Sequence, residues 1–211
     1  MLNLATARQW YPDGDAVHGF DHIERVYGMC QRIGREEGAD MEILLAAALL
    51  HDSQGSHPGK GQRNDHHLRS AEFAAEVLAA EGWDEERIRA VQHCIRAHRY
   101  RRGEEAPATL EAKILFDADK LDVIGAVGVV RALAYAFQVQ QPAFSEPSTS
   151  YKKDGTKAPG EGHSAYHEYL FKLNKIAAAL FTPTARRIAA GRQQFLDDYF
   201  EELAAEMRGE R

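Results

Sequence analysis

The feature that most constrains the fold is an apolar run that ends in two ionisable residues. Residues 42–50 read EILLAAALL, and His51 and Asp52 follow directly. Because the run is apolar on nearly every side, it predicts a buried helix that begins after a cap at Asp40. Taken alone, this pair favours a structural role. His51 would be a cation stabilised by the helix C-terminus, and Asp52 would form a turn. An anion at that end opposes the helix macrodipole by about 0.3–1 kcal/mol, however, so Asp52 needs a further explanation.

Helical periodicity continues along most of the chain, and no strand-like alternation competes with it. The 211 residues are enough for one domain with a single substantial core. The predicted fold class is therefore all-α, a single-domain helical bundle over residues 1–211. The first expected helices run from a cap at Asp21 to a stop at Gly38, from Met41 to Leu50, through Leu68 and Leu78 to a stop at Gly82, and from Trp83 to His98. One long helical segment is expected from Leu110 to Phe137. Two closing helices are expected within 164–207, and Thr182 caps the second of them.

The charge of the chain limits the classes of partner. Its formal net charge of −6 at pH 7 argues against wrapping by a nucleic acid backbone, whereas a small anionic substrate remains open because a local site can be cationic. The first fifteen residues lack a secretory-signal pattern and no uncharged run reaches membrane-spanning length, so we expect a cytoplasmic protein with no membrane partner. Cys30 and Cys94 are expected to be reduced, buried thiols. Both a monomer and a homodimer are compatible with the sequence.

The segment from Gln140 to Gly162 is predicted to be a flexible loop or lid. Loops longer than about 15 residues in a compact domain usually have a function or are disordered. The length of the segment, its composition, and Lys152, Lys153 and Lys157 motivate the expectation that it covers the functional site. The prolines and glycines that interrupt a helical pattern between 139 and 163 are Pro142, Pro147, Pro159, Gly155, Gly160 and Gly162.

Three carboxylates lie inside the segment predicted to be most buried, in the stretch DADKLD from Asp117 to Asp122. Burying an unpaired carboxylate is costly in free energy. Asp117 has Lys113 four residues before it and Lys120 three residues after it, so its charge can be answered within the helix. Asp119 has no cation at those spacings, and Asp122 adds a like charge. Asp119 therefore requires a cation from outside the helix.

A divalent metal ion can supply that cation, with His22, His51 and Asp52 as further ligands beside Asp119. Imidazole nitrogens and carboxylate oxygens together suit several divalent metals. The alternative for His22 is a surface histidine at a helix start, where the dipole disfavours a protonated imidazole but not a neutral one bound to metal. The sequence thus predicts a metal site with these four ligands, and Mn, Co, Ni, Fe, Mg and Zn are all open.

The order of these residues resembles the HD-domain superfamily. His22 stands in HIERV, His51 and Asp52 stand in ALLHD, and Asp119 stands in ADKLD, within a motif core of residues 18–135. The segments HGFDHIERV, EAKILFDADKLDVIGAVG and HEYLFKLNKI are similar to a bacterial subgroup that includes nucleotide pyrophosphohydrolases. The resemblance implies an all-α fold of the HD-domain type, a His-Asp pair that binds metal, and phosphohydrolase activity.

The resemblance also implies a second metal, which in many members is held by two histidines between the His-Asp pair and the last aspartate. His67 and His98 occupy the matching places, as ligands of a second metal or of phosphate, and a hydrogen-bonded core histidine is the alternative for His98. His18 and His66 are interpreted as neighbours only. Several related nucleotidases have a catalytic acidic residue shortly after the pair. Residues 53–55 are Ser, Gln and Gly here, which leaves the general acid-base group unassigned.

The expected reaction is attack of a metal-activated water on a phosphate ester or anhydride. Asp52 or Asp117 is expected to orient this water. The subgroup implies a nucleotide substrate, including a nucleoside triphosphate cleaved to monophosphate and pyrophosphate. An ordinary solvated charge is the alternative for every cation that we expect near the phosphates. These cations are Arg25, Lys60, Arg63, Arg69 and Lys120.

Two other classes of function remain open. Some folds of this type hold two irons and react with oxygen, and His67 and His98 would then be additional ligands. A metal- or nucleotide-binding regulator without turnover is the third class, and the missing acidic residue after Asp52 favours it. Iron content, oxygen uptake and a nucleotide hydrolysis panel discriminate among the three.

Overall fold

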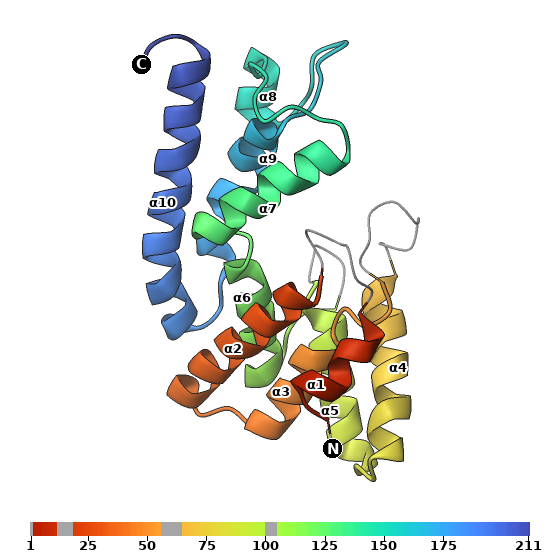
Figure 1. The fold of residues 1–211 in the computed structure, drawn as a ribbon. Helices are drawn as coiled ribbons and strands as arrows, with labels where there is room; N and C mark the ends of the chain where they lie inside the picture. Colours follow the sequence, from red (N-terminus) through yellow and green to blue (C-terminus); the bar gives the residue numbers. More distant parts are fainter. Residues whose placement is uncertain (1, 12–18, 56–64, 100–104) are drawn as a thin grey trace. The chain divides into compact units, whose positions relative to one another are not determined.

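The computed structural model describes residues 2–11, 19–55, 65–99 and 105–211, and these residues contain helices, turns and no strand (Figure 1). The predicted all-α fold class is therefore confirmed. The chain separates into two compact units. The first comprises Met1–Asp119 with Leu180–Ala185, and the second comprises Lys120–Ala179 with Arg186–Arg211.

The first unit is a cluster of helices around the apolar helix α3. α3 packs against α2 and α5, and α4 packs against α5 (Figure 1). Most of α3 is buried, as its apolar sequence predicts. The elements of this unit are α1 (Leu4–Ala7), the 3₁₀ turn η1 (Arg8–Trp10), α2 (Phe20–Glu37), α3 (Met41–Leu50), α4 (His66–Ala80), α5 (Glu85–Ala97) and α6 (Leu110–Leu121), the last two residues of which belong to the second unit.

The helix ends follow from capping residues in the sequence. Asp40 accepts hydrogen bonds from the amides of Glu42 and Ile43, and Asp84 accepts one from the amide of Arg87, so both act as the predicted caps. Gly38 ends α2 in the left-handed conformation with φ of 75°, which favours glycine.

The predicted cap of α2 at Asp21 is wrong. The helix begins at Phe20, with Gly19 in the extended cap conformation. Asp21 lies in the first turn, where its carboxylate pairs at 2.6 Å with Arg25 four residues later. The ion pair along the helix, together with the favourable dipole for an acid in the first turn, explains the acid without a capping role.

The second unit contains five shorter elements and one long helix. Within it, α7 packs against α9. The long helix α10 begins after Thr182, as predicted, and the Thr182 hydroxyl accepts a hydrogen bond from the amide of Ala185. The elements are α7 (Gly125–Gln138), α8 (Thr149–Asp154), α9 (Ala165–Phe171), the 3₁₀ turns η3 (Leu173–Lys175) and η4 (Ala177–Ala179), and α10 (Pro183–Met207), whose first residues belong to the first unit.

The prediction of one helix from Leu110 to Phe137 is wrong, because the chain leaves the helix between α6 and α7. Gly125 has φ of 75°, a conformation that L side chains rarely adopt. A Cβ atom at Gly128 would lie 2.4 Å from the carbonyl oxygen of Val123, so glycine is needed for this close approach. Asp122, at the break, pairs with the buried guanidinium of Arg131 on α7.

The segment predicted as a loop or lid, 140–162, contains a helix and a hydrogen-bonded centre. α8 lies within it, and the Glu161 carboxylate accepts hydrogen bonds from the amide and hydroxyl of Ser148 at 2.7 and 2.6 Å. Glu161 also accepts from the amide of Ala158 at 2.6 Å and interacts with Nε2 of His167 at 3.1 Å. That the segment is flexible and covers the functional site stays a prediction, as does the division into a motif core, this segment and closing helices.

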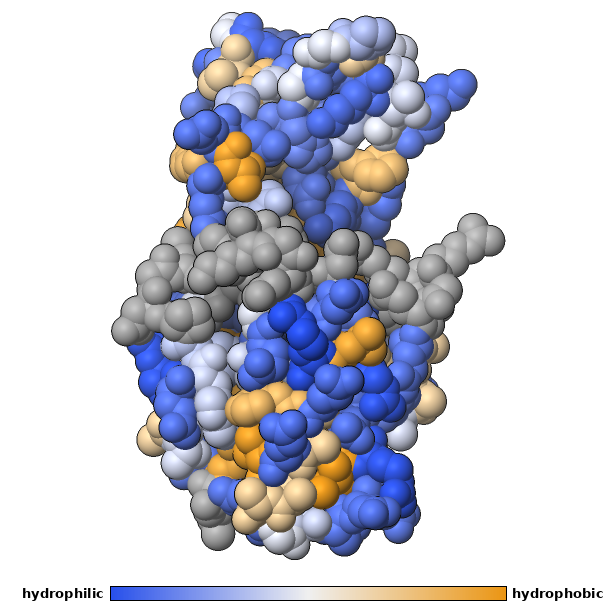
Figure 2. All heavy atoms as spheres, turned by 90° about the vertical axis from the view of Figure 1, so that its right-hand side faces the viewer, coloured by the Kyte–Doolittle hydropathy of each residue, from blue (hydrophilic) through white to orange (hydrophobic). Residues whose placement is uncertain are grey.

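On the one face that Figure 2 presents, most of the described residues are hydrophilic. Figure 2 shows hydrophobic residues in small groups separated by hydrophilic ones on the face that it presents. Among the helices that the structure describes, no single one is both long and apolar enough to cross a membrane, and α6 and α7 meet that test only when taken together.

Candidate metal centre

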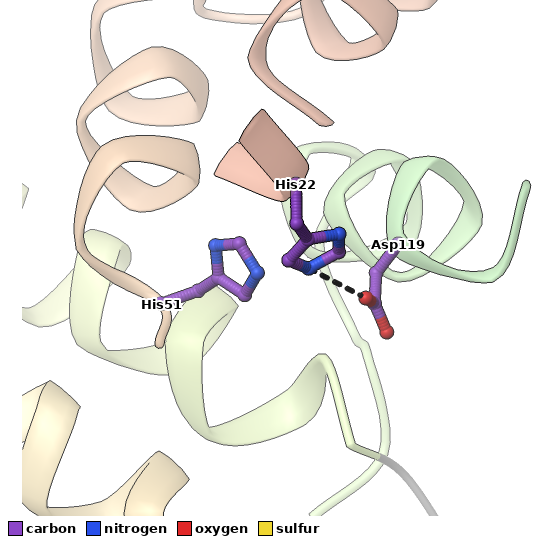
Figure 3. A group of neighbouring side chains, drawn as sticks. All are labelled: His22, His51 and Asp119. Atoms are coloured by element: carbon purple, nitrogen blue, oxygen red, sulfur yellow. Dashed lines mark ion pairs between the residues drawn. The ribbon is translucent and has the colours of Figure 1, made fainter. Parts of the chain in front are cut away.

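The first group of candidate ligands brings together His22, His51 and Asp119, which lie far apart in the sequence. His22 lies in the first turn of α2, His51 directly follows α3, and Asp119 lies near the end of α6. One ligand atom from each lies within 4.8 Å of the other two. Nε2 of His22 is 3.5 Å from Oδ1 of Asp119, and the side chains converge on one point (Figure 3).

The second group consists of Asp52, His66 and His98, and its ligand atoms also lie within 4.8 Å of one another. His66 is the first residue of α4, and His98 directly follows α5. Oδ1 of Asp52 is 3.2 Å from Nε2 of His66 and 3.6 Å from Nε2 of His98. All three side chains are buried.

Asp52 joins the two groups. Its Oδ2 atom lies 3.9 Å from Nε2 of His22 and 3.9 Å from Nε2 of His51, which belong to the first group. Its Oδ1 atom faces His66 and His98 of the second group. Asp52 could therefore contribute a ligand oxygen to either group.

The ring orientations of two histidines fit metal binding. Nδ1 of His51 donates to the carbonyl oxygen of Ala48 at 2.9 Å, and Nδ1 of His98 donates to that of Ile95 at 2.5 Å. A carbonyl oxygen can only accept, so the Nε2 atom of each neutral ring keeps its lone pair. Nε2 of His51 is buried and has no hydrogen-bond partner among the described residues. A divalent metal would satisfy this nitrogen, so the residues present fit the ion.

Electrostatics also favour the ligand forms of these side chains. Burial lowers the pKa of His51 from 6.5 to about 4, so its ring is neutral at pH 7. Burial alone would raise the pKa of Asp52, but the imidazoles of His51, His66 and His98 outweigh it and hold that pKa well below its ordinary value. A neutral imidazole beside an ionised carboxylate is the state that binds a divalent cation.

The structure brings together all four first-site residues that the sequence predicts, and His98 with them. It places His66, and not His67, in the second group, although the sequence interpretation gave His66 no role. His67 is buried beside it, with the two ring centroids 5.7 Å apart. Adjacent residues in the first turn of a helix point about 100° apart, and the phase depends on the first helical residue, which the sequence does not define closely.

Asp117 lies outside both groups of candidate ligands. Its carboxylate is fully buried and accepts hydrogen bonds from the amide of Phe181 at 2.8 Å and from the amide and hydroxyl of Thr182, both at 2.7 Å. These donors lie at the start of α10, where the helix dipole favours an anion. These donors were not predicted, since the sequence suggested Lys113 and Lys120 as the partners of Asp117.

The structure describes three of the five cations that the sequence places near the phosphates. Arg25 pairs with Asp21 on the same helix, and Arg69 is half-buried on α4. Lys120 follows Asp119 on α6 and is the first residue of the second unit. Lys60, Arg63 and His18 lie outside the described residues.

Known proteins are similar to this chain over nearly its whole length. The family model for the HD domain matches residues 19–124. The uncharacterized protein YpgQ of Bacillus subtilis is 30% identical over 200 residues, which cover 93% of this chain and 88% of YpgQ. The crystal structure of B. subtilis YpgQ in complex with ADP has a TM-score of 0.75 at 28% identity and covers 98% of this chain and 99% of its own. A structure described as a predicted HD-superfamily hydrolase from an uncultured Thermotogales bacterium has a TM-score of 0.64 at 28% identity, with coverages of 97% and 90%.

Proposed function

The chain belongs to the HD-domain family, and we propose that it is a metal-dependent phosphohydrolase that acts on a phosphate ester or anhydride. One observation carries the proposal: two groups of buried or half-buried histidine and aspartate side chains face each other across the carboxylate of Asp52. Hydrolysis of phosphate esters requires a strong nucleophile at neutral pH and neutralisation of charge on the phosphoryl group. When bound, a divalent metal supplies both, since it polarises phosphoryl oxygen and lowers the pKa of bound water from 15.7 to about 7.

The side chains of this chain have distinct tasks in that reaction. His22, His51 and Asp119 would hold one ion, and His66 and His98 would hold a second, with Asp52 shared between them. We assign the orientation of the attacking water to Asp52, because its carboxylate is ionised and faces both groups. Asp117, the other candidate from the sequence, has its oxygens engaged by the start of α10.

The proposed substrate is a nucleotide, including a nucleoside triphosphate cleaved to monophosphate and pyrophosphate. Two observations support a nucleotide. The motifs resemble those of a subgroup with nucleotide pyrophosphohydrolases, and the similar protein YpgQ has been crystallised in complex with ADP. A hydrolase centre with mixed nitrogen and oxygen ligands suits Mn, Fe, Co, Ni or Zn better than a site built from oxygen alone, and Mg remains to be compared with them.

The proposal is tested by a panel of nucleoside mono-, di- and triphosphates with Mn, Co, Ni, Fe, Mg and Zn, and the products are resolved by chromatography. We expect metal-dependent hydrolysis that His51→Ala abolishes. His93→Gln is the matched control, because His93 is a histidine of α5 that bonds Glu105 outside both ligand groups. It should keep full activity.

The same panel distinguishes the other two classes of function when oxygen uptake and the binding of metal and nucleotide are measured beside it. The two joined ligand groups would also suit two irons, in which case the protein purified with iron should consume oxygen and leave the nucleotides intact. A regulator should bind metal and nucleotide without turnover. Either result would overturn the phosphohydrolase proposal.

A further inference from the structure

Tyr11 lies between the ends of two helices that carry metal-site histidines. Its hydroxyl donates a hydrogen bond of 2.8 Å to the carbonyl oxygen of Leu49, two residues before His51. Its ring centroid lies 5.5 Å from that of Phe20, two residues before His22. One side chain therefore touches the N-terminal end of α2 and the C-terminal end of α3.

The carbonyl of Leu49 needs such a donor because α3 ends there in an apolar environment. The last carbonyls of a helix have no partner within it. Two neighbours are bonded locally, Ala48 by the ring of His51 and Leu50 by the amide and hydroxyl of Ser53. The Ser53 amide, which would bond Leu49 if the helix continued, is thus used elsewhere. A hydroxyl from another part of the chain takes its place.

The surroundings of Tyr11 hold its ring in place and keep its hydroxyl protonated. The ring is buried in a core cluster with Ala7, Phe20, Ile23 and Leu49. Burial raises the pKa of Tyr11 well above its ordinary value, and the Asp52 carboxylate adds to the rise. The hydroxyl therefore keeps the proton with which it bonds the end of α3.

We infer that Tyr11 is a positioning residue for the metal centre, which holds the end of α3 against the start of α2 so that His51 and His22 meet at the distance a shared ion requires. The inference rests on the proposed function, because it concerns the same ligands. Residues that orient metal ligands typically change metal affinity by about 10–100-fold when they are altered.

The test is Tyr11→Phe, which removes the hydroxyl and keeps the ring. Tyr151→Phe is a matched control, because the Tyr151 hydroxyl also donates to a buried backbone carbonyl, that of His167, at 3.0 Å in the second unit. Binding of Mn²⁺ is measured by calorimetry, and the geometry of the site is read from the visible absorption of the Co²⁺-loaded protein. Both variants should lower Tm by about 2–4 °C, as loss of one buried hydrogen bond does in a chain of this size.

We expect Tyr11→Phe to weaken Mn²⁺ binding by roughly 10-fold and to shift the Co²⁺ bands, while Tyr151→Phe leaves both unchanged. Wild-type affinity and an unshifted spectrum in Tyr11→Phe would overturn the positioning role alone. Equal losses in the two variants would also overturn it, since they would reflect general destabilisation. Absence of metal binding by the wild-type protein would instead overturn the proposed function, and this inference with it.

Discussion

Asp117 and Asp119 are two residues apart on α6 and have different partners. Asp119 is 18% exposed and faces His22, whereas Asp117 is fully buried and accepts hydrogen bonds from Phe181 and Thr182. A half-turn of helix therefore separates a side chain that can bind an ion from one that anchors the start of another helix. Both side chains are carboxylates, so the groups that surround each of them determine whether it can bind an ion or anchors a helix.

Replacement of the two aspartates by alanine should separate these roles. We expect Asp119→Ala to lose bound metal and activity together, because it removes a ligand. Asp117→Ala should keep stoichiometric metal and lose roughly 2–3 kcal/mol of unfolding free energy, because it leaves buried amide and hydroxyl donors unsatisfied. Metal analysis and denaturant unfolding of both purified variants check this. An Asp117→Ala protein without metal beside a metal-loaded Asp119→Ala protein would show that the wrong face of α6 was assigned to the site.

The lowered pKa of His51 predicts a dependence of stability on pH in the metal-free protein. Because the folded-state pKa of about 4 lies below the ordinary 6.5, protons bind the unfolded state first as the pH falls. This contribution to stability is complete above pH 6.5 and declines as the pH falls from 6.5 to about 4, with a loss of about 2 kcal/mol at pH 5. Denaturant unfolding in the presence of a chelator measures it.

The control for this pH dependence is His51→Leu, which cannot take up the proton. Its unfolding free energy should change less steeply with pH between 4.5 and 6.5, by up to about 1.4 kcal/mol per pH unit. Identical slopes for the two proteins would contradict the lowered pKa.

At the residue scale, the sequence was sufficient where a charge lacked any local answer. Asp119 has no cation three or four residues away along the helix, and this absence led to the candidate ligands on other helices. The sequence was insufficient for Asp117, because Lys113 and Lys120 offered plausible local partners and gave no reason to expect the donors that lie more than 60 residues away. The choice of His66 over His67 depended on the phase of a helix start, which composition does not define.

At the element scale, apolar periodicity located the helices but not the break between α6 and α7. Both sides of the break are apolar, so the pattern continues through it. The break depends on backbone contacts, namely the left-handed Gly125 and the approach of Gly128 to Val123. A glycine in an apolar helix has two interpretations, close packing or a change of direction, and the sequence does not separate them.

Gly128→Ala should therefore destabilise the protein although alanine is the better helix former. The added Cβ would lie 2.4 Å from the carbonyl oxygen of Val123, and such overpacking typically costs about 1–3 kcal/mol. Gly191 on α10 is a matched control, since a Cβ there would meet nothing within 4 Å. Gly191→Ala should stabilise the protein by about 0.5–1 kcal/mol. Thermal unfolding of both variants shows whether each substitution lowers or raises Tm. Equal stabilisation by the two substitutions would show that α7 can move away from the break.

At the scale of the whole molecule, the six residues of the two ligand groups and the neighbouring His67 all belong to the first unit. A metal ion held by these residues would therefore stabilise that unit directly. The residues are His22, His51, Asp52, His66, His67, His98 and Asp119.

Hydrogen exchange should reveal this distribution. At a free Mn²⁺ concentration about 100 times Kd, binding adds about 2.7 kcal/mol, which slows exchange through opening of the first unit by roughly 100-fold. We expect added protection in α2, α3 and α5, and none in α8 and α9. Mass spectrometry of peptides with and without metal measures it, with His51→Ala as the control that should not respond. Equal protection of α8 and α9 would mean that the two units open together.

The first unit is not one continuous stretch of chain, since it includes Leu180–Ala185. On a ribosome, residues 1–119 emerge well before the donors of Phe181 and Thr182 that Asp117 requires. At about 5–20 residues per second, these donors are synthesised roughly 3–12 s after the last residue of that stretch. The candidate metal ligands can thus be synthesised long before Asp117, two residues before Asp119 on α6, meets the donors that the folded structure gives it. We therefore expect loading of the proposed ion to be a late event in the biosynthesis of this protein, after most of the chain has been made.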